Sequence, residues 1–160
     1  MVITKDKIYD LLQDIKDPEI PHISIIELGM INDVEISDDS INIDLTPTFI
    51  ACPAINHIKE DVVSYINKKT GIKTNVNVSI EPPWNSNRIT ETGKVILKKY
   101  GLAPPDKHDG NICFKLLQNV SCPYCDSKNT LIRSNFGSTL CRSMHYCKEC
   151  KQSFEHFKPI

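Results

Sequence analysis

Four of the seven cysteines stand in two Cys-x-x-Cys pairs, and this arrangement constrains the fold more than any other feature of the chain. Each pair forms a tight turn that directs two thiolates at one point. Two such pairs, separated by a hairpin-sized stretch, complete a tetrahedral metal site. The sequence therefore predicts a zinc ribbon over residues 113–160, and its four ligands are Cys122, Cys125, Cys147 and Cys150.

The predicted zinc is structural, because four thiolates fill its coordination sphere whereas a catalytic zinc keeps one position for water. A module of this size buries too little surface to fold alone, so the metal would supply much of its stability. The same thiolates can also hold a single iron or an iron-sulfur cluster, although ribbon spacing favours Zn2+. His145 is an alternative ligand. In an alternating strand it would share one face with Cys147, Ser143 and Cys141, so its place on that face does not by itself mark it as a ligand.

The composition indicates a cytoplasmic protein for which nucleic-acid and membrane partners are not expected. The 160 residues carry a net charge of -1, and 40% of them are apolar, which is enough for a core. From residue 119 on there are six Lys/Arg and three Asp/Glu, and the charge of a zinc tetrathiolate nearly cancels this excess. The sequence shows no signal peptide and no membrane-spanning run. In a reducing compartment, paired cysteines are metal ligands far more often than disulfides.

The first half of the chain predicts a small two-layer α+β domain over residues 1–82, ordered helix-strand-strand-helix-strand. Thr4 can cap a first helix, and Pro53 suits the first position of a second helix that ends at Gly71. Three alternating runs predict strands, and a polar turn over residues 37–40 joins the first two. These runs are Val34–Ile36, Ile41–Leu45 and Val76–Ile80.

Residues 83–112 predict a Pro-rich linker that carries one short helix. Two Pro-Pro pairs flank an amphipathic segment from Thr90 to Tyr100. Trp84 is the only tryptophan, and we expect it to anchor this linker on the first domain. Beyond the linker, Gly137 is the expected turn between two strands of the ribbon.

Cys52 has the strongest chemical signal among the cysteines outside the predicted metal site. The second helix would place Cys52 at its N-cap, where unpaired N–H groups and the helix dipole stabilise a thiolate. Such a thiol is both a nucleophile and a ligand for soft metals at neutral pH. The hydroxyls of Thr46 and Thr48 are expected to gather around it. A packed thiol is the alternative for Cys52, and it is the expectation for Cys113 and Cys141.

Two groups of motifs carry a resemblance to known families over nearly the whole chain. The amino-terminal group resembles the SufT-type domain of iron-sulfur cluster assembly factors, on Asp17–Pro21, Glu27–Met30 and Thr46–Ala54. The second group is similar to the PaaD family of the bacterial phenylacetyl-CoA epoxidase system. It comprises Pro83-Trp84, Glu91–Gly93, Tyr100–Pro105, the two cysteine pairs, Phe136–Thr139 with Cys141, and Phe154 with Phe157-Lys158.

The resemblance implies a maturation role, in which the protein helps to install iron-sulfur or di-iron centres in the epoxidase components. In such families the cysteine that matches Cys52 is the suspected cluster-handling residue, with acids matching Glu19 and Glu27 near it. One departure is Asp126, which stands where the family usually has glycine after the first cysteine pair. Because Asp tolerates the left-handed conformation better than most residues, we expect this turn to survive.

We therefore predict a maturation factor whose partners are protein clients of the epoxidase system, with a second copy of the chain as a possible partner. Its metals would be a structural Zn2+ and, transiently, iron or a cluster at Cys52. The first alternative is a thioesterase-like enzyme in which Cys52 attacks an acyl-CoA and His22 or His57 acts as the base. The second is a zinc ribbon that binds nucleic acid, whose affinity would fall steeply with salt.

Overall fold

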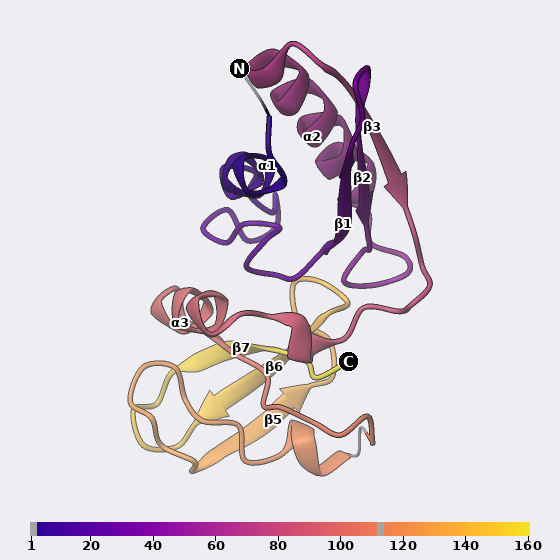
Figure 1. Ribbon diagram of the computed structural model, residues 1–160. Coiled ribbons are helices and arrows are strands. Elements are labelled where there is room, and N and C mark those ends of the chain that lie inside the picture. Colours follow the sequence, from indigo (N-terminus) through magenta and orange to yellow (C-terminus); the bar gives the residue numbers. More distant parts are fainter. Residues whose placement is uncertain (1–2, 112–113) are drawn as a thin grey trace. The chain divides into compact units, whose positions relative to one another are not determined.

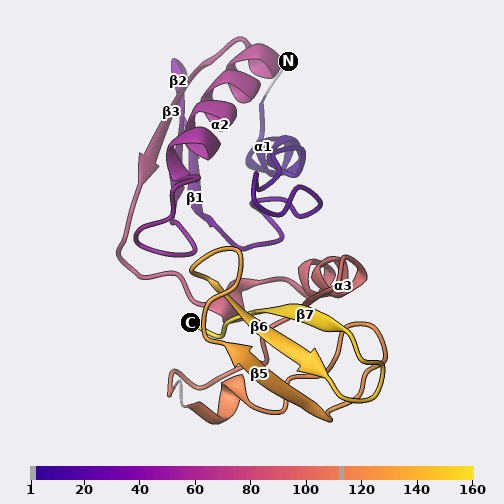
Figure 2. The same ribbon diagram turned by 180° about the vertical axis from the view of Figure 1, so that it is seen from behind.

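A computed structural model describes residues 3–111 and 114–160 of the chain (Figures 1 and 2). The chain forms two compact units, Met1–Trp84 and Asn85–Ile160. Cys113, which we predicted to be a packed thiol, lies outside the described residues. Among the described residues, no helix has the length and apolar character needed to cross a membrane.

Two helices of the first unit follow from the capping and stripe signals in the sequence. Helix α1 (Lys5–Leu12) begins after Thr4, whose Oγ1 accepts a hydrogen bond from the Lys7 N–H at 3.3 Å. Helix α2 (Ile55–Thr70) buries Ile58, Val62 and Ile66 on one face. It ends at Gly71, whose φ of 71° is the left-handed conformation that a helix C-cap favours in glycine.

The sheet of the first unit has the order β1-β2-β3. Strands β1 (Ile31–Ile36) and β2 (Ser40–Leu45) form an antiparallel hairpin, whereas β3 (Lys73–Val78) runs parallel to β2. The parallel pairing follows because α2 crosses over between β2 and β3. Alternate residues of β2 are buried, and Figure 1 shows α1 and α2 on one side of the sheet. The opposite face is polar.

The predicted α+β fold of this region, in the order helix-strand-strand-helix-strand, is confirmed. Several boundaries differ from the prediction, and β1 begins at Ile31, before the predicted Val34. Helix α2 begins at Ile55 with Ala54 as its N-cap, so Cys52 is not the N-cap residue. The reason is a turn before the helix, in which the Cys52 N–H bonds to the Phe49 carbonyl at 2.9 Å. Strand β3 begins and ends earlier than expected, because its pairing with β2 runs from Lys73 to Val78.

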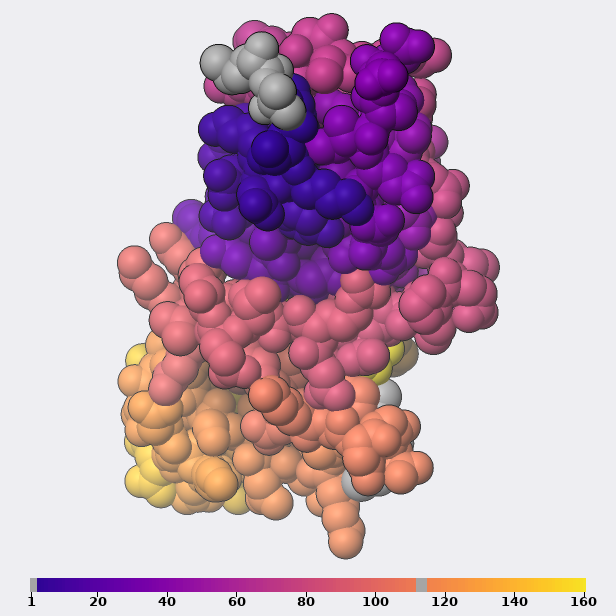
Figure 3. Space-filling model, in the orientation of Figure 1, coloured from indigo at the N-terminus to yellow at the C-terminus, as the bar shows by residue number. Residues whose placement is uncertain are grey.

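Trp84 anchors a loop of the first unit at the end of the sheet. Its side chain is only 5% exposed, and its indole Nε1–H donates to the Leu28 carbonyl at 2.8 Å. Two residues further on, the Met30 carbonyl accepts the Thr46 N–H at 2.8 Å. The segment Glu27–Met30 is thereby tied both to Trp84 and to the residue that follows β2. In the space-filling view the residues of this unit form a continuous packed surface (Figure 3).

The second unit is a four-stranded sheet of order β4-β7-β6-β5 with one α-helix. Helix α3 (Glu91–Lys99) begins after Thr90, whose side chain accepts the Gly93 N–H. Strand β4 (Leu102–Ala103) pairs in parallel with β7 (Ser153–Phe157), so part of the 83–112 segment belongs to the ribbon sheet. Strand β6 (Arg142–Cys147) lies antiparallel to both β7 and β5 (Thr130–Ser134). Two 3-10 turns lie at Ser86–Arg88 and Phe114–Leu117.

We predict that Trp84→Phe lowers the free energy of unfolding of the first unit by about 1–3 kcal/mol, since it leaves the buried Leu28 carbonyl without its donor. Urea unfolding followed by far-UV circular dichroism would measure this loss. Tyr65→Phe is the matched control, because it removes one hydrogen bond to Asp14 that lies at the surface. Equal losses in the two variants would contradict the anchoring role of Trp84.

Candidate metal centre and the Cys52 loop

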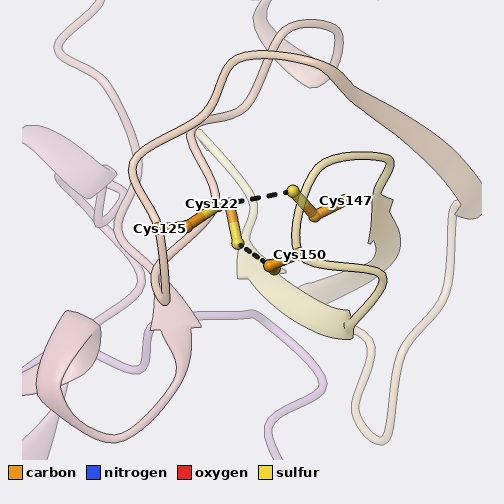
Figure 4. Close-up of side chains that lie close together, drawn as sticks. All are labelled: Cys122, Cys125, Cys147 and Cys150. Carbon is orange, nitrogen blue, oxygen red and sulfur yellow. Dashed lines mark hydrogen bonds between the residues drawn. The ribbon is translucent and has the colours of Figure 1, made fainter.

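The four predicted ligand cysteines converge on one point (Figure 4). Their sulfur atoms all lie within 4.8 Å of one another, with 3.6 Å between Cys122 and Cys150 and 3.6 Å between Cys125 and Cys147. A zinc ion with Zn–S bonds of about 2.3 Å needs sulfur atoms about 3.8 Å apart at the corners of a tetrahedron. The donor set and its spacing therefore fit a tetrathiolate zinc site.

Two turns of the same design position these sulfurs. The Asp126 N–H bonds to the Cys122 carbonyl at 2.9 Å, and the Asp126 φ is 60°. The second pair begins at the end of β6, and Lys151, directly after it, has a φ of 61°. Each pair is thus followed by one left-handed residue, which turns the chain so that both thiols face inward. Asp126 adopts the conformation that the sequence required of it.

Burial and crowding change the acidity of the clustered thiols. Cys122 and Cys147 are buried beside Ala103, Val120 and Phe154. Burial and the neighbouring thiols raise the pKa of Cys150 to about 12, and burial also raises the pKa of Cys122. Burial acts in the same direction on Cys147, but the N–H groups of Cys150 and Glu149 lower the pKa of Cys147 to about 7. A divalent cation would displace these protons and balance the thiolate charge.

His145 is not one of the four converging ligands. It shares the buried face of β6 with Ser143 and Cys147, as predicted, and its Nε2 lies 2.9 Å from the Ser143 hydroxyl. Its ring stacks on Phe154, and burial lowers the pKa of His145 to about 4. The sequence did not reveal its neighbour His156, whose pKa is lowered to about 3 by burial and by His145. Both imidazoles are therefore neutral and form part of the packing beneath the site.

Cys52 lies in the loop between β2 and α2, and its residue is half-buried. Two residues separate it from the first residue of α2, so the helix dipole, which falls off within one turn, acts on it less than an N-cap position would allow. Thr46 and Thr48 are buried, and the Thr46 Oγ1 has no hydrogen-bond partner among the described residues. Ile50, by contrast, is 81% exposed. The loop therefore combines buried hydroxyls with an apolar side chain at the surface.

Glu27 has a structural role that we did not predict, although the sequence contains the motif for it. Its Oε2 accepts the Ser24 N–H at 2.7 Å, while the Ser24 hydroxyl accepts the Glu27 N–H at 3.1 Å. These reciprocal bonds are a capping box, which the Ser-x-x-Glu spacing encodes. Glu19 follows Asp17, whose buried carboxylate accepts the N–H groups of Glu19 and Ile20. Roles for Glu19, Glu27, Thr48 and Cys52 toward a metal remain predictions.

The enzyme alternative gains no support from His57. Its Nε2 lies 3.4 Å from the Asp61 carboxylate, one turn further along α2, and both side chains are largely exposed. A general base must instead reach the proton of the nucleophile.

Both units match known families. Residues 5–82 match the iron-sulfur cluster assembly protein family, and residues 112–158 match the PaaD zinc beta ribbon domain. A solved DUF59 domain from Bacillus anthracis superposes with a TM-score of 0.55 at 30% identity, over 58% of this chain and 90% of its own. Fold and site therefore define a protein that joins an iron-sulfur assembly domain to a zinc ribbon.

The full-length relative gives the family. A protein of Escherichia coli K12, named as one of the subunits of 1,2-phenylacetyl-CoA epoxidase, is 33% identical over 154 residues, which is 96% of this chain and 92% of that protein. The chain belongs to this PaaD family. A Porphyromonas gingivalis Fe-S protein maturation auxiliary factor is 32% identical over 55% of this chain and 85% of its own length. The Staphylococcus aureus Fe-S protein maturation auxiliary factor SufT is 30% identical over 51% and 93%.

We predict that the wild-type chain binds about one zinc ion, and that Cys147→Ser loses it and unfolds the second unit, because removing one thiolate opens the cage. Metal analysis together with a two-dimensional NMR spectrum would measure both effects. Cys141→Ser is the control, since Cys141 is buried in the same unit but lies outside the four-sulfur cluster. Zinc retained by Cys147→Ser, or iron in place of zinc in the wild type, would contradict this assignment.

Proposed function

We propose that this protein is an accessory factor that helps to assemble iron-sulfur or di-iron centres in components of phenylacetyl-CoA epoxidase. The observation that carries the proposal is the match of the whole chain, both units included, to a PaaD-type protein of the epoxidase. The match of the first unit alone to iron-sulfur maturation factors supports the same role from an independent direction. The role is therefore maturation of other proteins, with iron or a cluster as cargo.

The Cys52 thiol is the group that we propose handles this cargo. Thiolate is the ligand that iron and iron-sulfur clusters prefer. The loop presents Cys52 half-buried next to exposed residues, whereas the ribbon cysteines are committed to a closed site. Thr48 would supply a nearby hydroxyl, and Glu19 and Glu27 would supply carboxylates. The open residues of the loop leave room for a second protein to approach the thiol.

A single thiol cannot complete the coordination of iron, so further ligands must come from elsewhere. A client protein that receives the cargo would supply them during transfer, and a second copy of the chain would supply a second Cys52. In either case the cargo is held only while two proteins are in contact. This suits a factor that passes a metal centre on and does not retain it.

The ribbon, in this proposal, contributes stability and recognition and takes no part in the chemistry. One metal ion would use all four of the converging sulfurs, which would leave no open position for a substrate.

We predict that epoxidase components expressed with the Cys52→Ser variant contain several-fold less iron and acid-labile sulfide than those expressed with the wild type, since a hydroxyl is a poor ligand for soft metals. Iron and sulfide analysis of the purified components would measure the loss. Ala51→Ser is the matched control, because it places a hydroxyl at the exposed neighbouring position and keeps the thiol. Fully loaded components with Cys52→Ser would remove Cys52 from the proposed chemistry.

A further inference from the structure

The loop between β5 and β6 holds apolar side chains out into solvent. Phe136 is 64% exposed and Leu140 is 50% exposed. The Lys158 ammonium lies 5.2 Å from the centroid of the Phe136 ring and donates a hydrogen bond to the Asn135 carbonyl at 3.1 Å. At the end of β5, the Arg133 guanidinium lies 5.0 Å from the centroid of the Tyr146 ring. Exposed apolar groups and cations therefore occur together in and beside this loop.

The loop is held in place by a polar network. The Glu155 carboxylate accepts hydrogen bonds from the Ser138 N–H and hydroxyl, and it pairs with Arg142 at 2.8 Å, where both side chains are largely buried. Gly137 donates to the Arg142 carbonyl at 2.9 Å. A Cβ at Gly137 would lie 2.5 Å from the Glu155 Oε1, so a side chain there would displace the carboxylate. Phe136 and Leu140 are thus presented by an ordered loop, which reduces the entropy lost on binding.

The charge of the second unit indicates what such a loop binds. Residues 85–160 contain twelve Lys/Arg and six Asp/Glu, a formal charge of +6, and the zinc tetrathiolate would lower this to about +4. Residues 1–84 contain seven Lys/Arg and fourteen Asp/Glu. The near-zero charge of the whole chain hides this difference. Residues 134–141 contain no carboxylate, and the nearby Glu155 is paired with Arg142.

The comparisons support a role for the second unit in recognition. The two maturation factors match only 51–55% of this chain while 85–93% of their own length is matched. A match of that length is about the size of the first unit, which matches the iron-sulfur cluster assembly family, whereas residues 112–158 match the PaaD zinc beta ribbon domain. A feature that selects particular clients is expected in the second unit.

We propose that Arg133, Phe136, Leu140 and Lys158, together the loop surface, dock an acidic segment of a client protein that also carries apolar side chains. The apolar pair would be buried against those side chains, and the two cations would face the carboxylates of the segment. This inference rests on the proposed function and names where its client binds. A protein is favoured over a nucleic acid because this surface offers one aromatic ring, Phe136, beside the aliphatic Leu140, whereas proteins that bind single strands stack successive bases on several aromatic side chains.

The test uses the full-length chain and purified phenylacetyl-CoA epoxidase components, with binding measured by biolayer interferometry at several salt concentrations. We expect Phe136→Ser and Leu140→Ser each to weaken binding about tenfold, as for a central apolar contact. The double change Arg133→Gln with Lys158→Gln should slow association and flatten its dependence on salt. Val95→Ser is the matched control, since Val95 lies on α3 in the same unit, is 67% exposed and should leave binding unchanged.

Zinc content verifies that each variant is folded before its binding is compared. The proposal is overturned if Phe136→Ser binds as Val95→Ser does, or if no component binds the wild type. It is also overturned if a single-stranded 20-mer DNA binds the wild type at low salt and loses affinity in the same variants. Cys52→Ser separates this inference from the proposed function, because it should bind the components normally while failing to load them. If Cys52→Ser binds the components normally and they are fully loaded with iron, the proposed role of Cys52 is excluded while the proposed docking surface stands.

Discussion

The second unit depends on one cross-link, the convergence of four thiols from two turns that are distant in sequence. Among the described residues, the buried cluster around these sulfurs holds Ala103, Val120 and Phe154 besides Cys122 and Cys147. A cluster of this size offsets only part of the conformational entropy of ordering the two turns. A metal ion that binds the folded arrangement much more tightly than the unfolded chain would supply the difference.

The two units divide the cysteine chemistry between a closed site and an open one. In the ribbon, each thiol of the cluster has three sulfur neighbours within 4.8 Å, so a bound ion has no position left for another ligand. Cys52 lies in the loop between β2 and α2, beside exposed residues, and is not part of that cluster. The same side chain therefore serves stability in one unit and, in our proposal, transient binding in the other. The difference arises from the number of converging sulfurs and not from the thiol itself.

The parts that sequence could predict are those encoded by local spacing. The two Cys-x-x-Cys pairs specified the metal site, and the Thr4 cap and the polar turn at 37–40 specified elements of the first unit. The predicted start of α2 was wrong because Pro53 is compatible with either a first helical position or a preceding turn. Only the hydrogen bond from the Cys52 N–H to Phe49 distinguishes the two.

Other features depended on partners far away in sequence. Strand β4 has two residues and is defined only by pairing with β7, some fifty residues further on, so no local pattern could reveal it. The Ser24–Glu27 capping box, by contrast, is local and could be read from the Ser-x-x-Glu motif, and the residues that follow Ser24 form a turn and not a helix. The polar network around Glu155 is likewise non-local, since Arg142 and Glu155 meet across neighbouring strands. The two features that depend on distant partners, strand β4 and the network around Glu155, both lie in the second unit.

The metal and the loop surface are connected through one strand. Strand β6 begins at Arg142, which pairs with Glu155 and holds the β5–β6 loop, and it ends at Cys147, one of the four candidate metal ligands. Phe154, the neighbour of Glu155 on β7, packs beside Cys147. Releasing the metal would free one end of β6 and loosen the pairing that orders the loop at the other end. In our proposal, a closed zinc site would thus control the binding of a partner without touching it, because the energy that orders the strand also orders the loop that the partner meets.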